Sequence, residues 1–117
     1  MGGHHIHSKA GFKNNANYDP KKGFSISQDY MNQRGWNHQA MTNKQRELFR
    51  ELASSGRANT IFEHNRIAVE ALQAGGASLA QARSLVAESL LNLRRQGALS
   101  PTNIPWYYID YINKLHK

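Results

Sequence analysis

TNKQRELFRELASSG, residues 42–56, contains signals for both ends of an amphipathic helix. Thr42 and Gln45 form a capping box, in which the Thr hydroxyl meets the amide three residues later and the Gln side chain reaches back. Gly56 is a typical helix stop. One apolar stripe lies between these ends, at Leu48, Phe49, Leu52 and Ala53. We therefore predict a helix that begins at Thr42 and ends at Gly56.

Further helices are predicted downstream of this one. Thr60 with Glu63, and Ser78 with Gln81, repeat the same capping pattern. Glycines at positions 75, 76 and 97 are expected to end these two helices. The second of them has an apolar stripe that reads as core, at Leu79, Ala82, Val86, Leu90 and Leu93. A last helix is predicted to begin at Pro105, with apolar positions Trp106, Ile109, Ile112 and Leu115.

The part of the chain before Thr42 has a different character, being rich in Gly, Asn, His and Lys. Residues 4–8 and 23–27 are short enough for two strands, joined by the turn-rich residues 14–20. A chain of 117 residues can bury only one modest core. The sequence therefore predicts a single domain over residues 1–117, mainly α with a small β-ribbon.

The composition favours a polyanionic partner. The 15 Lys and Arg outnumber the 8 Asp and Glu, which leaves a net charge of +7, a balance typical of proteins that bind nucleic acid or an acidic protein. With no Cys, any metal must be held by imidazole, carboxylate, amide or water oxygen. No apolar run approaches the ~20 residues of a membrane span, so we expect no membrane partner.

The most informative stretch for function is Gly2-Gly3-His4-His5-Ile6-His7. In an extended segment, adjacent His4 and His5 would face opposite sides. Such a run can be the remnant of a purification tag. Ile6 interrupts it, however, and it continues into Ser8-Lys9-Ala10-Gly11-Phe12, which favours a functional interpretation.

A resemblance to a known family runs through most of the chain. The stretch Gly3-His4-His5-Ile6-His7-Ser8-Lys9-Ala10 resembles the Gly-His-His toxin nucleases of the His-Asn-His/endonuclease VII superfamily. The resemblance to the same family continues through Gly23-Phe24-Ser25-Ile26-Ser27, Asn37-His38-Gln39, Met41-Thr42, Gln45-Arg46, Glu63-His64-Asn65-Arg66-Ile67-Ala68 and Ile104-Pro105-Trp106.

This resemblance implies a ββα-metal finger over residues 1–55, followed by a helical part over residues 56–117. In such a finger a two-strand ribbon and a helix hold one divalent ion against the scissile phosphate. The family pattern assigns a metal-ligand role within the catalytic pair to His4, the general-base role to His5 and a second ligand role to His38. Mg²⁺ is the expected ion, with Mn²⁺, Zn²⁺ or Ni²⁺ as alternatives.

The third metal ligand departs from the family pattern. Many relatives have a ligand in the first turns of the finger helix, yet positions 42–53 contain no His or Asp. His64 is one candidate, with Asn37 and Asn43 as alternatives, and a site completed by water would suit Mg²⁺. A single His on a helix is more often a packed or solvated residue than a ligand.

Residues for holding the nucleic acid are proposed among the basic and aromatic side chains. Arg46, Arg66 and Lys9 are the candidates for phosphate contacts, although such residues are commonly only a solvated helix face. Trp36 and Trp106 can stack on bases in an enzyme of this kind. We assign both to the core, because a large aromatic beside helical apolar positions more often packs there.

The resemblance also implies a biological setting. Such domains form the carboxyl-terminal part of bacterial polymorphic toxins used in interbacterial competition. The expected partners are DNA or RNA, a cognate acidic immunity protein, and the larger secreted polypeptide that carries the domain into the cytoplasm of the target cell. The expected activity is that of an HNH-type endonuclease, a DNase that hydrolyses phosphodiester bonds with little sequence specificity.

Other functions remain open from the sequence. Two histidines can share acid and base work in a metal-independent ribonuclease. The charge and the amphipathic helices would also suffice for a helical nucleic-acid-binding module without chemistry. A protein-docking domain ranks last, because it leaves both the His run and the charge unexplained.

Overall fold

The computed structural model describes residues 3–106. Within that range, an antiparallel ribbon of β1 (His4–His5) and β2 (Ser25–Ile26) precedes four helices, α1 (Gln28–Arg34), α2 (His38–Ser55), α3 (Ile61–Ala74) and α4 (Leu79–Gln96). Two short 3₁₀ helices, η1 (Lys9–Phe12) and η2 (Pro20–Lys22), lie between the strands. The predicted mainly α fold with a small β-ribbon is confirmed, although both strands are shorter than predicted.

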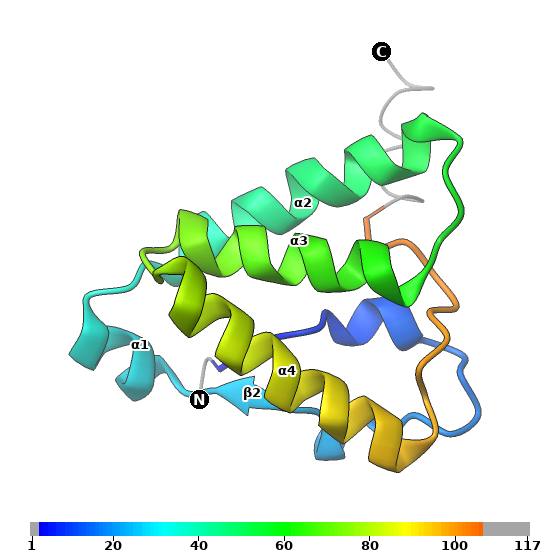
Figure 1. Ribbon diagram of the computed structural model, residues 1–117, viewed down its shortest axis with the longest axis horizontal. Helices are drawn as coiled ribbons and strands as arrows, with labels where there is room; N and C mark the ends of the chain where they lie inside the picture. The colour runs from blue at the N-terminus through cyan, green and yellow to red at the C-terminus, as the bar shows by residue number, and fades with distance from the viewer. Residues whose placement is uncertain (1–2, 107–117) are drawn as a thin grey trace.

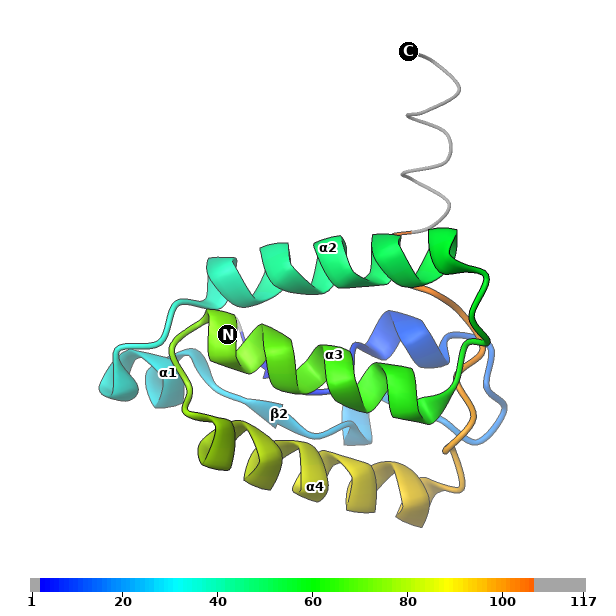
Figure 2. The same cartoon turned by 45° about the horizontal axis from the view of Figure 1, so that its top comes forward.

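The helix α3 lies between α2 and α4 and packs against both (Figure 1; Figure 2). The ribbon and η1 lie behind α3 in these views. The ribbon pairs His4 with Ile26, and just beyond it the amide of Ile6 donates to the carbonyl of Phe24 at 3.2 Å. Ile6 and Ile26 are buried in the main core together with side chains of all four helices, including Met31, Met41, Leu72 and Val86. The core therefore fixes the ribbon against the helical layer.

The predicted start of α2 at Thr42 is wrong by one turn. Asn37 caps this helix, since its Oδ1 accepts from the amide of Ala40 at 2.9 Å. Thr42 lies inside the helix, where its hydroxyl donates to the carbonyl of His38 at 3.2 Å. Asn is as good a cap as Thr, so two start signals compete in this sequence. The earlier start makes His38 the first residue of the helix.

The sequence did not predict α1 at all. The hydroxyl of Ser27 accepts from the amide of Tyr30 at 3.0 Å, and Gly35 ends the helix in the left-handed region with φ 71°. Met31 is its buried residue. A single buried apolar side chain gives no helical periodicity to detect.

The other predicted helix ends are confirmed. Thr60 caps α3, and Ser78 with Gln81 forms a complete capping box at the start of α4. Leu79, the first residue of the apolar stripe predicted on α4, is 43% exposed and therefore lies outside the helix face that packs in the core. The last predicted helix falls largely on residues 107–117, outside the described residues. No helix within residues 3–106 is long and apolar enough to cross a membrane.

A strap of residues 98–106 returns the chain to the ribbon after α4. The amides of Thr102 and Asn103 both donate to the carbonyl of Gly11, at 2.9 and 3.2 Å. The side-chain amide of Asn103 also donates to the carbonyl of Ala10 at 3.1 Å. These bonds lead Pro105 to the ribbon side of the molecule.

Gly75, at the end of α3, contacts the start of α2 directly. Its carbonyl accepts from the amide of Asn37 at 2.8 Å. A Cβ on Gly75 would lie 2.5 Å from the Cγ of Met41 and 2.9 Å from the carbonyl oxygen of Asn37. Only a residue without a side chain fits here, and this close approach sets the position of the adjacent His38.

Replacing Gly75 tests that constraint. We expect Gly75→Ala to lower the free energy of unfolding by about 1–3 kcal/mol, because the added methyl overpacks the contact. Urea unfolding measures it. Gln73→Ala is the matched control, since Gln73 is exposed on the same helix, and should change stability by less than about 0.5 kcal/mol. A Gly75→Ala protein as stable as the control would contradict the close packing.

Candidate functional site

A cavity of about 400 Å³ opens between β1, η1, the start of α2 and the strap. The side chains that give it chemical character are His4, His5, Lys9, His38, Gln45 and Trp106. The three histidines that the resemblance placed together therefore line one cavity. His4 and His5 come from β1, and His38 comes from the start of α2.

His4 and His38 form the inner part of this cavity. Their ring centroids are 5.2 Å apart and the rings meet edge to face at 79°. His4 is 3% exposed, and its Nε2 is buried without a hydrogen-bond partner within residues 3–106. Buried polar atoms are nearly always satisfied, so such an atom calls for an explanation. A metal ion bound by Nε2 would supply one.

The electrostatic environment keeps His4 neutral. Burial, together with repulsion from the nearby His38 and His5, lowers its pKa from 6.5 to about 4. Metal binding requires the neutral imidazole, with a free lone pair. His4 and His38 therefore fit as two ligands of a divalent cation.

His5 lines the same cavity as the adjacent His4, although the two were expected to face opposite sides of the strand, and it has different polar contacts. Its Nε2 lies 3.2 Å from the carbonyl oxygen of Pro20. A carbonyl only accepts, so Nε2 carries the proton of this bond and the neutral ring has its lone pair on Nδ1. Gly23 leaves room for the ring, since a Cβ there would lie 3.1 Å from the His5 Cδ2. This arrangement orients a proton acceptor.

His64, a candidate third ligand, does not line this cavity. It is 2% exposed, packed against the rings of Phe12 and Phe49 with centroid distances of 5.7 and 5.0 Å. Its Nε2 donates to the Oδ1 of Asn59 at 2.6 Å. Burial lowers the pKa of His64 to about 4. Its Nδ1, like the Nε2 of His4, is buried without a hydrogen-bond partner within residues 3–106, but the ring contacts and the bond to Asn59 place His64 in the core, away from the cavity.

The two Asn alternatives also have structural partners. The side chain of Asn37 caps α2. Asn43 is exposed and accepts from Gln39 at 2.9 Å. Neither side chain lines the cavity, and residues 3–106 contain no group of three His, Cys, Asp or Glu that could hold a metal ion. An ion at His4 and His38 would take its other ligands from water and substrate oxygen.

The three predicted phosphate contacts lie in different places. Lys9 is exposed and lines the cavity. Arg66 lies on α3, where its guanidinium pairs with Glu63 at 2.7 Å and Glu70 at 2.8 Å. Arg46 is partly buried on α2 and is not among the residues that line the cavity. Of the three, the structure brings only Lys9 to the histidines.

His7, the third histidine of the opening run, is buried and connects the chain after β1 to two helices. His7 Nε2 donates to the Oδ1 of Asn65 at 2.7 Å, and the hydroxyl of Ser89 donates to His7 Nδ1 at 2.6 Å. Ser89 is 2% exposed, which excludes it as an accessible nucleophile. His7 therefore ties the end of β1 to α3 and α4. Its partners lie 58 and 82 residues away, beyond any local sequence signal.

Gln45 and Trp106 line the cavity, although neither was assigned to the site from the sequence. Gln45 was predicted to reach back to a cap and instead is buried at the cavity. Trp106 was assigned to the core; it does pack on Phe49, with centroids 6.1 Å apart, but it also lines the cavity. The core assignment of Trp36 is confirmed, since it is 7% exposed.

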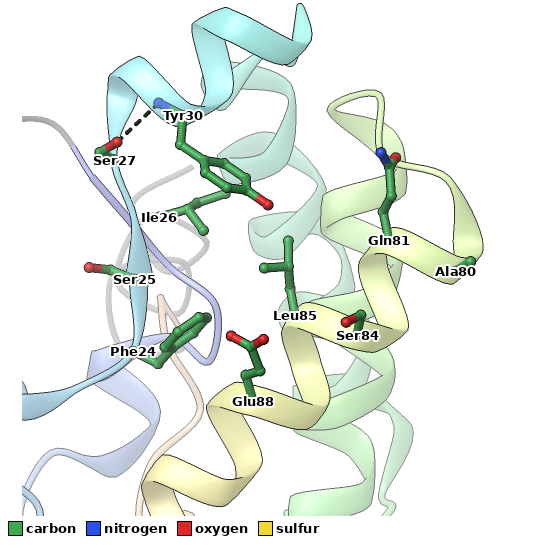
Figure 3. Close-up of a pocket in the computed structure, with 10 residues that line it drawn as sticks. All are labelled: Phe24, Ser25, Ile26, Ser27, Tyr30, Ala80, Gln81, Ser84, Leu85 and Glu88. Atoms are coloured by element: carbon green, nitrogen blue, oxygen red, sulfur yellow. Dashed lines mark hydrogen bonds between the residues drawn. The ribbon is translucent and has the colours of Figure 1, made fainter.

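A larger groove of about 790 Å³ lies elsewhere, between β2 and α4. Figure 3 shows Phe24 and Leu85 beside it, with the carboxylate of Glu88 at one end. Of the described residues that line it, Glu88 is the one carboxylate, and none is a His. The groove therefore lacks the cluster of imidazoles that the His cavity has.

Comparison with known proteins adds no relative. No family model, no curated protein and no solved structure matches the chain.

The burial of His64 predicts a loss of stability in acid. Its folded-state pKa of about 4 lies below the 6.5 of the unfolded chain, so the unfolded chain binds more protons between these values. The stabilisation is full above pH 6.5 and falls by about 3 kcal/mol as the pH drops to 4. His4 contributes a loss of the same sign.

The substitution His64→Gln isolates the contribution of His64 to this loss of stability in acid, because a Gln amide can donate to Asn59 and does not titrate. We expect its unfolding free energy, measured in urea at pH 7.5 and 4.5, to fall less between these pH values than that of the unsubstituted chain. The difference should be about 2 kcal/mol or more. Equal losses in both proteins would contradict a buried neutral His64.

Proposed function

We propose that the protein is a metal-dependent nuclease that hydrolyses DNA phosphodiester bonds with little sequence preference. The observation that carries the proposal is the convergence of His4, His5 and His38 on one cavity, where the buried Nε2 of His4 has no hydrogen-bond partner among residues 3–106. A DNA-binding module without chemistry would have no need for this arrangement.

The residues divide the work by position. His4 and His38 would hold the divalent ion, and burial keeps the His4 imidazole neutral for this role. That ion, when bound, polarises a phosphoryl oxygen and stabilises the leaving alkoxide. His5, oriented by the carbonyl of Pro20, takes the proton from the attacking water at Nδ1. Lys9 at the cavity holds the phosphate by charge.

A metal-independent ribonuclease fits the site less well. Acid and base work shared by two histidines requires one of the pair to be protonated. Burial holds the pKa of His4 at about 4, which disfavours the acid role near neutral pH. His4 is better suited to a ligand than to a proton donor.

The biological setting rests on the resemblance to Gly-His-His toxins. In this proposal the domain is delivered by a larger secreted polypeptide and acts in the cytoplasm of a competing bacterium. A cognate immunity protein would be acidic, because the chain carries a net charge of +7 and complementary charge speeds association. Such an inhibitor would cover the basic nuclease surface.

Plasmid cleavage tests the chemistry. We expect degradation with Mg²⁺ or Mn²⁺ and none in chelator. His5→Ala should lower kcat by about 10²–10⁴-fold, the usual contribution of a general base, and leave DNA binding largely intact. Asn43→Ala is the control, since this exposed residue does not line the cavity. Full cleavage in chelator, or by His5→Ala, would overturn the mechanism.

DNA affinity distinguishes the basic residues. We expect Lys9→Ala to weaken binding to DNA of any sequence and to reduce the salt dependence of log K by about one. Arg66→Gln should change neither, because Glu63 and Glu70 already engage the guanidinium. Fluorescence anisotropy over a salt series measures both effects. A larger loss for Arg66→Gln than for Lys9→Ala would restore Arg66 as the phosphate contact.

A further inference from the structure

We propose that Trp106 is a base-stacking residue of this site, and that the nuclease therefore prefers nucleic acid with unpaired bases. The inference rests on the proposed nuclease function and adds the substrate class. Trp106 lines the same cavity as His4, His5 and His38. A phosphate held at the histidines therefore has a base within reach of an aromatic ring.

The surroundings of the indole leave part of it available. Trp106 packs against Phe49, with centroids 6.1 Å apart and ring planes tilted by 39°. Trp106 is nevertheless only partly buried, unlike the buried aromatic residues Phe12, Trp36 and Phe49. It therefore both packs on Phe49 and lines the cavity.

The backbone at Trp106 adds an independent observation. Its φ is 64°, in the left-handed region that bulky residues rarely adopt. Such strain persists only where the surrounding structure imposes it, and it gathers at functional sites. The strap that leads to Trp106 is held in place by the bonds of Thr102 and Asn103 to Gly11 and by a 3.1 Å bond from Asn59 to the carbonyl of Asn103.

The chemistry of stacking agrees with the rest of the site. Every base has a flat face, so an aromatic platform binds bases without reading sequence. A base inside a duplex has both faces covered by its neighbours, and stacking on a side chain requires an unpaired or flipped-out base. A site with one Lys and one aromatic platform therefore favours single-stranded DNA or RNA.

Trp36 provides a matched control within the chain. It is 7% exposed and belongs to the main core, where it meets the ring of Tyr30 with centroids 5.8 Å apart. It does not line the His cavity. A substitution at Trp36 therefore reports on loss of an indole without loss of a stacking surface.

The test measures binding in chelator, so that no cleavage intervenes. Single-stranded 12-mers are compared, each with one nucleotide made abasic, by fluorescence anisotropy with the full chain. We expect one abasic position to weaken binding about tenfold, the usual loss for one stacked base. Trp106→Leu should bind the intact 12-mer about tenfold more weakly, and lose nothing further at that abasic position. Trp106→Tyr and Trp36→Phe should both stay within about threefold of the unsubstituted chain.

An unchanged affinity in Trp106→Leu, or an abasic penalty that persists in it, would overturn the inference. Should Trp106→Leu fail to fold by circular dichroism, Trp106→Asn replaces it, because Asn tolerates a positive φ and has no ring. The outcome is separable from the nuclease proposal. Plasmid cleavage without stacking would overturn only this inference, and stacking without metal-dependent cleavage would overturn only the proposed function.

Discussion

The edge-to-face contact between His4 and His38 is the constraint on which the site depends. His4 belongs to a strand of two residues, and His38 is the first residue of α2. Neither element could hold an imidazole in place alone. The register with Ile26 fixes the strand, and the bond between Asn37 and Gly75 fixes the start of the helix. The geometry of the candidate site is thus a product of tertiary packing.

The three histidines of the opening run show how position decides chemistry. His4 is buried beside His38, and its Nε2 has no hydrogen-bond partner in the part of the chain that the structure describes, whereas His5 is oriented by a backbone carbonyl at the cavity. His7, two residues later, is satisfied by Asn65 and Ser89. In this account the same side chain serves as ligand, base and structural connection. What differs between the three is the number of polar partners that the fold supplies.

Features encoded by local chemistry could be predicted from the sequence. The caps at Thr60 and Ser78 and the ends at Gly56 and Gly97 are each decided within a few residues, and the structure has all of them. The start of α2 could not be chosen in this way. Two caps compete there, and a bond to Gly75, far along the chain, accompanies the earlier one.

The candidate site, too, could be predicted only in part from the sequence. Adjacent histidines are visible in the sequence, and so is their likeness to a nuclease motif. The pairing of Arg66 with Glu63 and Glu70 has the three- and four-residue spacing of neighbours on one helix, so it could have been predicted from the sequence. The burial of His64 between the rings of Phe12 and Phe49 depends on residues far away in the chain and could not. Trp106 reaches the cavity through bonds from the strap to Gly11, about 90 residues earlier, and so its place there is invisible before folding.

The most direct measurement is anomalous scattering from a crystal soaked in Mn²⁺. The account predicts one strong peak within coordination distance of His4 Nε2 and a ring nitrogen of His38, with water completing the shell. No peak at this pair, or a peak at His64 instead, would contradict the claim that the two imidazoles converge to bind a metal ion.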